Sequence, residues 1–183
     1  MTMRGRMLAY AFVAIGLLGT IGASTMAQGG PPPTDAVPGS PGISFVVLSD
    51  LEPAAAGGLV MDMRRYTWEP GSYVTPHTHP GAAFIVCVET GSVGFSIQSG
   101  GAFVTRPDDG EDSKMMSGPM AVGDEVILEP GDCVAADELA GSTIHTVWNA
   151  SDEASTTIET YLYDSELPGR IFIDKPGTPR YRG

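Results

Sequence analysis

The three histidines of the chain are the side chains best suited to chemistry, and they occur at only two places. His77 and His79 stand one residue apart in "VTPHTHP", and His145 lies far downstream in "STIHTVW". Alternate residues of an extended strand point to the same side, so His77 and His79 are expected to present both rings to one face. Three converging neutral imidazoles can bind a divalent metal ion, and we predict His77, His79 and His145 as metal ligands. The alternative is three ordinary core histidines, each hydrogen-bonded in the interior.

Short β-strands are the elements that would have to position these rings. From residue 43 on, runs such as "LVMDMRRYTW", "FIVCVE" and "TTIETYLY" alternate with turn sequences such as "EPGS", "ETGS" and "EPGD". No stretch of this part shows a long helical period of apolar residues. Short strands at near-regular spacing, separated by Gly and Pro, predict an all-β fold that forms a sandwich or a closed barrel.

The ends of the chain differ in composition from this central part. Residues 1–27 combine two arginines, an apolar run and a small-residue stretch, which is typical of a secretory signal peptide. Residues 28–42 are rich in Pro and Gly and predict a linker. One domain is expected over residues 43–163, followed by a C-terminal tail, residues 164–183. The protein is therefore expected to be secreted or extracytoplasmic; an uncleaved N-terminal membrane anchor is the alternative.

The net charge limits the kinds of partner to be expected, and the cysteines bear on the compartment in which the protein is found. The formal net charge is −12, which repels nucleic acid and anionic membranes, so we expect neither as a partner apart from an N-terminal anchor. Cys87 and Cys133 are the only two cysteines. An exported chain permits a disulfide between them, whereas two buried free thiols would be the alternative.

Two sequence patterns surround the histidines. In the first, Gly71 is followed by five residues, then by His77 and His79, and later by Gly91. In the second, Gly131 of "EPGD" precedes His145, which is followed by three residues and then by Asn149. The spacing of these residues resembles the two conserved motifs of the cupin family.

The resemblance extends over residues 43–163 and implies a double-stranded β-helix, the jelly-roll barrel of the cupins. It has two departures from the family pattern. Ala83 and Phe84 stand where the family has a metal-binding glutamate, and Glu89 comes too late in the strand to replace it. The family's P-x-G is also missing, and the stretch from Gly131 to His145 is longer than the pattern.

The loss of the glutamate implies an all-histidine centre, because no protein carboxylate then offsets the charge of the ion. Such a centre favours a small, anionic ligand. By resemblance, the chain is expected to be a small-molecule oxidoreductase, dioxygenase-like, with iron as the first choice of metal and zinc, manganese, copper or nickel as the other candidates. The alternative is a non-catalytic cupin that binds a small ligand such as a sugar or a carboxylate.

Two further expectations concern the surroundings of the centre and the assembly. Tyr73 lies an even number of residues before His77, so it could face the same side and hydrogen-bond to a ligand histidine. No residue is assigned a catalytic role from the sequence. Since cupins often dimerise through their sheets, a homodimer is one expected assembly.

Overall fold

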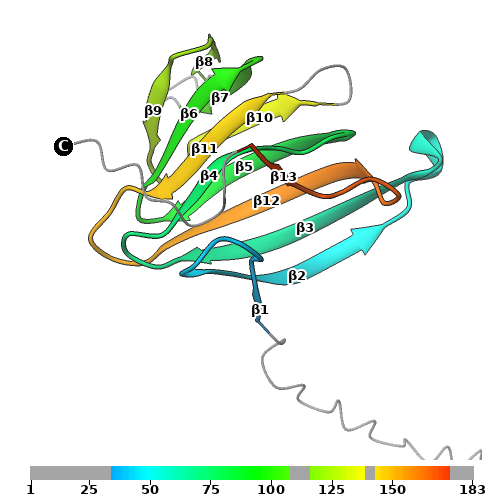
Figure 1. The fold of residues 1–183 in the computed structure, drawn as a ribbon, viewed down its shortest axis with the longest axis horizontal. Coiled ribbons are helices and arrows are strands. Elements are labelled where there is room, and N and C mark those ends of the chain that lie inside the picture. Colours follow the sequence, from blue (N-terminus) through cyan, green and yellow to red (C-terminus); the bar gives the residue numbers. More distant parts are fainter. Residues whose placement is uncertain (1–33, 108–115, 139–142, 174–183) are drawn as a thin grey trace, which may run out of the picture. The chain divides into compact units, whose positions relative to one another are not determined.

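The computed structural model describes residues 34–107, 116–138 and 143–173, and nearly all of this part consists of β-strands (Figure 1). No helix in the described part is long and apolar enough to cross a membrane. The elements are β1 (Asp35–Ala36), β2 (Ile43–Leu51), the short 3₁₀ helix η1 (Ala54–Ala56), β3 (Leu59–Trp68), β4 (Tyr73–Thr78), β5 (Ala82–Thr90), β6 (Val93–Ser99), β7 (Ala102–Arg106), β8 (Met116–Met120), β9 (Glu125–Leu128), β10 (Cys133–Asp137), β11 (Ile144–Asn149), β12 (Ser155–Asp164) and β13 (Ile171–Phe172).

The strands form two sheets in which every described pairing is antiparallel. The larger sheet has the order β1-β2-β3-β12-β5-β10-β7-β8, and the smaller has the order β13-β4-β11-β6-β9. Strands far apart in the chain therefore become neighbours, such as β12 between β3 and β5 (Figure 1). This crossed order in two facing sheets confirms the predicted all-β jelly-roll architecture.

Alternation along the strands divides each sheet into an inner and an outer face. On β5, Phe84 and Val86 are buried and Ile85 between them is 50% exposed. The inner faces of both sheets contribute to one core, which includes Phe95, Ile97, Leu128 and Val134, each 1% exposed or less. Burial of each such side chain contributes about 1.5–3 kcal/mol to folding.

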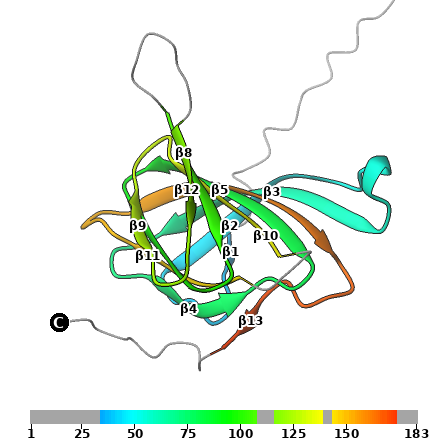
Figure 2. The same cartoon turned by 90° about the horizontal axis from the view of Figure 1, so that it is seen from above.

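The folded unit extends beyond residues 43–163 at both ends. β1 lies in the expected linker and pairs with the start of β2, and β13 lies in the expected tail and pairs with β4 (Figure 2). Val37 is 7% exposed and joins the core. Edge pairing of this kind satisfies backbone groups that would otherwise remain open. The expected signal peptide, residues 1–27, lies outside the described residues.

The turn after β11 is held by one asparagine, Asn149, the last residue of the second motif. Its side-chain amide donates to the carbonyls of Trp68 (2.9 Å) and Glu153 (2.7 Å). Its side-chain oxygen accepts bonds from Ser151 and Ser155. Asn149 is 7% exposed, so these bonds satisfy a buried polar group and fix the passage from β11 to β12.

Cys87 and Cys133 lie directly opposite each other on the neighbouring strands β5 and β10. Their sulfur atoms are 2.08 Å apart, and the bond joins residues separated by 46 positions in the sequence. Closing a loop of this length restricts the unfolded chain more than the folded one.

Reduction of this disulfide is expected to lower the free energy of unfolding by about 2–4 kcal/mol, because the unfolded chain regains loop entropy. Chemical denaturation of the oxidised protein and of the Cys87→Ala/Cys133→Ala double variant measures the difference. Intact mass before and after reduction provides the control. An unchanged mass, or equal stability of the two proteins, contradicts the prediction.

Candidate metal centre

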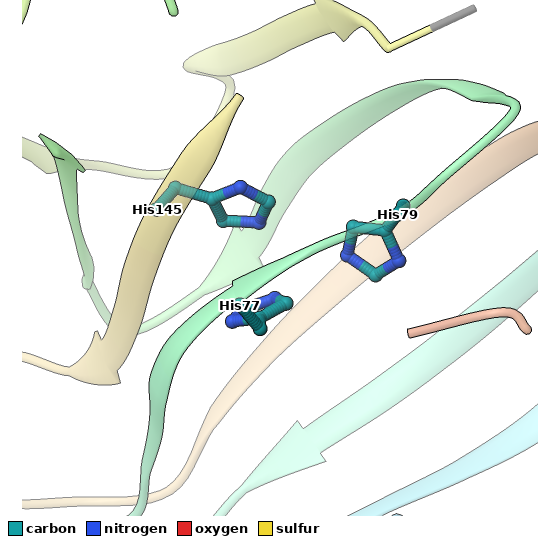
Figure 3. A group of neighbouring side chains, drawn as sticks. All are labelled: His77, His79 and His145. Carbon is teal, nitrogen blue, oxygen red and sulfur yellow. The ribbon is translucent and has the colours of Figure 1, made fainter. Parts of the chain in front are cut away.

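His77, His79 and His145 come together between β4 and β11 (Figure 3). One potential ligand atom from each residue lies within 4.8 Å of the other two. The rings are buried, with exposed fractions of 1%, 4% and 2% respectively. The sheet register explains the meeting, because His145 lies directly opposite His77 in the β4–β11 pair. The distant third histidine is thus brought beside the first pair.

Backbone carbonyls fix the orientation of two of the rings. The Nδ1 of His77 donates to the carbonyl oxygen of Thr75 at 2.8 Å, and the Nδ1 of His79 donates to that of Gly169 at 2.6 Å. A carbonyl oxygen can only accept, so Nδ1 carries the proton in both rings. Nε2 therefore keeps its lone pair, and this is the arrangement of histidines that ligate metals.

The rings are held in the neutral form. Burial lowers the pKa of His79 to about 3, and it lowers the pKa of His77 and of His145 well below the ordinary value. The positive charge of Arg170 and the proximity of the rings to one another lower the pKa values of His77 and His145 further. Neutral imidazole is the form that binds a metal ion.

The space beside the rings is small. It measures about 20 Å³ and is lined by the three histidines together with side chains such as Phe95, Val147 and Glu159. A water molecule needs roughly 10–15 Å³ by this kind of measure. The space therefore fits an ion with a bound water.

Solved structures with a similar fold place this arrangement in context. The chain matches no protein-family model and no curated protein sequence. It is similar to KdgF from Halomonas sp., with 16% identity, a TM-score of 0.49, and coverage of 73% of this chain and 90% of KdgF. It is also similar to a cupin 2 domain-containing protein from Halorhodospira halophila, with 18% identity, a TM-score of 0.43, and coverage of 75% and 70%. An oxalate oxidase in complex with glycolate has 19% identity, a TM-score of 0.39, and coverage of 78% and 60%. The second of these three proteins is itself described as a cupin. The strand order of the chain and its three converging histidines are in agreement with the cupin resemblance of its sequence.

The cupin glutamate position is occupied by apolar side chains. Ala83 is on the outer side of β5, and Phe84 points inward with 3% exposure. The ring of Phe84 lies 5.5 Å from that of His79 and 5.3 Å from that of His145, measured between centroids. Phe95 stacks on His145 at 4.9 Å. Within the described residues, the candidate ligand group contains no carboxylate.

A carboxylate nevertheless lies behind the candidate centre, on Glu138. Its Oε1 is 3.6 Å from the Nδ1 of His145, and both atoms are buried without a hydrogen-bond partner. Its Oε2 accepts bonds from the Thr78 hydroxyl at 2.6 Å and from the His79 backbone N–H at 2.5 Å. Burial raises the pKa of Glu138, and these two bonds oppose the rise. Glu138 is placed to accept a hydrogen bond from the Nδ1–H of His145, which would leave Nε2 as the free nitrogen of all three rings.

The expectation for Tyr73 fails because β4 contains a bulge. Between the pairs His145↔His77 and Val147↔Val74, three residues of β4 span the same distance as two of β11. The extra residue changes the side to which the preceding residues point. Val74 is 1% exposed and lines the space beside the rings, whereas Tyr73 does not line it.

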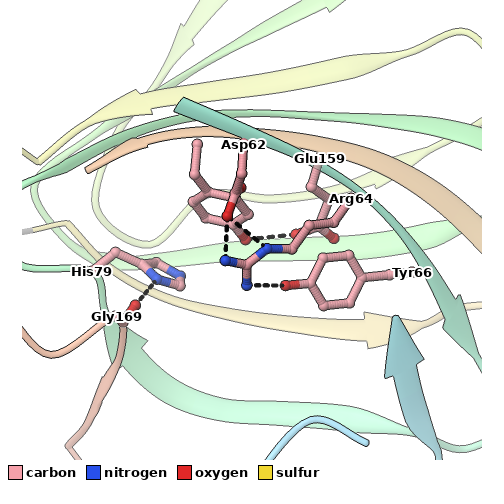
Figure 4. A network of polar contacts seen from close by, with 7 residues as sticks. Asp62, Arg64, Tyr66, His79, Glu159 and Gly169 are labelled. Carbon is pink, nitrogen blue, oxygen red and sulfur yellow. Dashed lines mark hydrogen bonds and ion pairs between the residues drawn. The ribbon is translucent and has the colours of Figure 1, made fainter. Parts of the chain in front are cut away.

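A second polar group lies on β3, on the inner face next to the histidines (Figure 4). The Nε and Nη2 of Arg64 donate to the Oδ2 of Asp62, the former at 3.0 Å. The Nη1 of Arg64 contacts the Tyr66 hydroxyl at 3.4 Å. Burial raises the pKa of Tyr66 to about 12, so its hydroxyl stays protonated.

The neighbouring strand β12 adds a buried carboxyl group, Glu159. It is 3% exposed, and its two oxygens accept bonds from the hydroxyls of Thr157 (2.9 Å) and Tyr161 (2.6 Å). Burial raises the pKa of Glu159, although these two bonds lower it. The alternation in "TTIETYLY" was the available sequence signal, because it puts Thr157, Glu159 and Tyr161 on one face.

Replacement of Glu138 with Gln is expected to weaken cobalt or zinc binding about 10- to 100-fold, because the amide no longer orients the His145 ring as a carboxylate does. Competition titration with a chromogenic chelator measures the affinity. Glu125→Gln, an exposed change on β9, is the matched control. Equal affinities of wild type and Glu138→Gln would show that Glu138 does not position His145.

Proposed function

We propose that this chain is an exported, metal-dependent oxidoreductase that acts on a small anionic molecule in the manner of cupin dioxygenases. The observation that supports the proposal is the cluster of three buried, neutral imidazoles within 4.8 Å of one another. Two of them are tied back through Nδ1, so their free nitrogens are available to a metal. A divalent metal held there would supply Lewis acidity and open positions for substrate and dioxygen.

The residues of the chain have three roles in this proposal. His77, His79 and His145 hold the ion. Thr75, Gly169 and Glu138 keep the rings in one orientation through the partners described above. Phe84 and Phe95 pack against the rings and keep bulk water away, which strengthens electrostatic interactions at the centre.

Iron is our first choice of metal because the proposed reaction involves dioxygen. Imidazole ligands suit zinc, copper and nickel as well, and manganese is a further candidate. An all-imidazole set contributes no negative charge. The ion would therefore keep its full positive charge, and an anionic substrate would be favoured over a neutral one.

Export is supported by the disulfide between Cys87 and Cys133, because such bonds persist in oxidising compartments and are rare in the cytosol. It is also in agreement with the signal-like composition of residues 1–27. The homodimer expected from the resemblance remains a prediction.

A second candidate function is ligand binding without turnover. It is favoured by the small size of the space beside the rings, about 20 Å³. A ligand in a neighbouring pocket could bind without reaching the ion. A sugar or a carboxylate would then be held by the polar side chains around that pocket.

Metal analysis of the protein purified from its native compartment is the test of the metal centre. We expect about one redox-active ion per chain, lost in His77→Ala and retained in Thr146→Ala, which changes the opposite face of β11. A metal-free wild type, or retention of the ion in His77→Ala, overturns the proposal. Oxygen consumption with a panel of thiols, diketones and aromatic acids then separates turnover from simple binding.

A further inference from the structure

Arg170 carries a charge in an unusual setting. It lies in the segment before β13, and its Nε is buried without a hydrogen-bond partner. Its Nη1 makes one long contact, 3.4 Å, to the Ser40 hydroxyl, and its guanidinium lies 5.8 Å from the centre of the Phe172 ring. In the part of the chain that the structure describes, no carboxylate forms an ion pair with it. A partly buried charge without a counter-charge is costly unless a ligand supplies one.

Arg170 stands between two spaces. One is the small space beside the three histidines, and the other is a pocket of about 350 Å³. Both are lined by His79, Tyr161 and Arg170. The larger pocket is of the size that binds small organic ligands. A molecule in it would therefore contact His79, which is itself one of the three histidines of the centre.

Among the described residues around the larger pocket, Arg170 is the arginine that forms no ion pair. Arg64 also lines the pocket, but Asp62 already neutralises it. Glu159 is engaged by two hydroxyls and makes no ion pair with Arg170. Asp164 is a second carboxylate in the lining; it accepts a bond from the backbone N–H of Glu166 and makes no ion pair with Arg170. The guanidinium of Arg170 therefore remains available to an anion.

The rest of the lining is aromatic and favours an apolar ligand body. Phe45, Tyr66, Tyr161, Tyr163 and Phe172 all contribute to the walls. Burial keeps the hydroxyl of Tyr66 protonated, as described above, and it can donate a hydrogen bond. Aromatic walls contribute contact area with little loss of side-chain entropy.

We propose that the 350 Å³ pocket binds a small organic carboxylate, whose carboxylate group pairs with Arg170 and whose apolar body lies against the aromatic walls. The proposal rests on the proposed function, since it names the substrate class for the same site. Arg170 follows Gly169, whose carbonyl oxygen accepts a hydrogen bond from the Nδ1–H of His79. One short segment thus holds a metal ligand in place and also carries the anchor for the substrate.

The test uses three pairs of probes, each a carboxylate and its uncharged amide: acetate with acetamide, benzoate with benzamide, and phenylacetate with phenylacetamide. Isothermal titration calorimetry measures their binding to the full-length protein, both metal-free and loaded with Co²⁺. Arg170→Met and Arg170→Lys are compared with Arg65→Met. Arg65 is the matched control because it is an exposed arginine on the outer face of β3, paired with Glu89.

We expect at least one carboxylate to bind wild type about tenfold or more tightly than its amide, since a charged hydrogen-bonded pair contributes at least that much. Arg170→Met should weaken the carboxylate about 10- to 100-fold and leave the amide unchanged. Arg170→Lys should restore part of the affinity, and Arg65→Met should have no effect.

Equal affinities for every carboxylate and its amide in wild type would overturn the proposal, as would no binding of any carboxylate. Equal loss in Arg65→Met and Arg170→Met would overturn it as well. The titrations of the metal-free protein test carboxylate binding independently of the proposed metal centre. Arg170-dependent carboxylate binding in a protein that takes up no cobalt would preserve this inference and contradict the proposed function.

Discussion

The register between β4 and β11 is the constraint on which the candidate centre depends. It places His145 directly opposite His77 and so brings a ring from the second half of the chain to His77 on β4 and His79 just after it. A slip of one residue would turn the His145 ring to the outer face of the sheet. The register is fixed from both sides, because β6 also pairs with β11 and Asn149 anchors the end of the strand. The bulge beside His145 then determines which neighbours, such as Val74, share the interior with the rings.

Burying three imidazole rings lowers the free energy of unfolding unless their ring nitrogens have hydrogen-bond or metal partners. Two Nδ1 atoms are satisfied by backbone carbonyls, and the third faces the carboxylate of Glu138. Within the described part of the chain, the Nε2 atoms make no comparable hydrogen bond, and the lowered pKa values of the three rings keep these nitrogens unprotonated. A bound cation is the partner that such nitrogens accept most readily. Arg170 is comparable, because its Nε is buried without a hydrogen-bond partner and no ion pair forms with it among the described residues.

The strands and the histidine cluster could be predicted from the sequence because both depend on local pattern. Alternation in "LVMDMRRYTW" and "TTIETYLY" determines which side chains point inward, and the Gly-containing turns mark the strand ends. The side of β4 to which Tyr73 points could not be predicted. A single bulge reverses the alternation along the strand, and no residue type in the sequence marks its position. Glu138 and Arg170 were missed for another reason. Glu138 meets His79 across 59 positions and Gly169 meets it across 90, and no spacing rule connects residues so far apart.

X-ray absorption spectroscopy of the Co²⁺- or Zn²⁺-loaded protein tests the central claim most directly, because it counts and identifies the atoms around the ion. We expect multiple scattering from three imidazole rings, with nitrogen at about 2.0–2.1 Å for zinc. The Nδ1 bonds to Thr75 and Gly169 require the ligand atom of His77 and of His79 to be Nε2. A shell with one imidazole or none, or one dominated by carboxylate oxygen, would contradict the account.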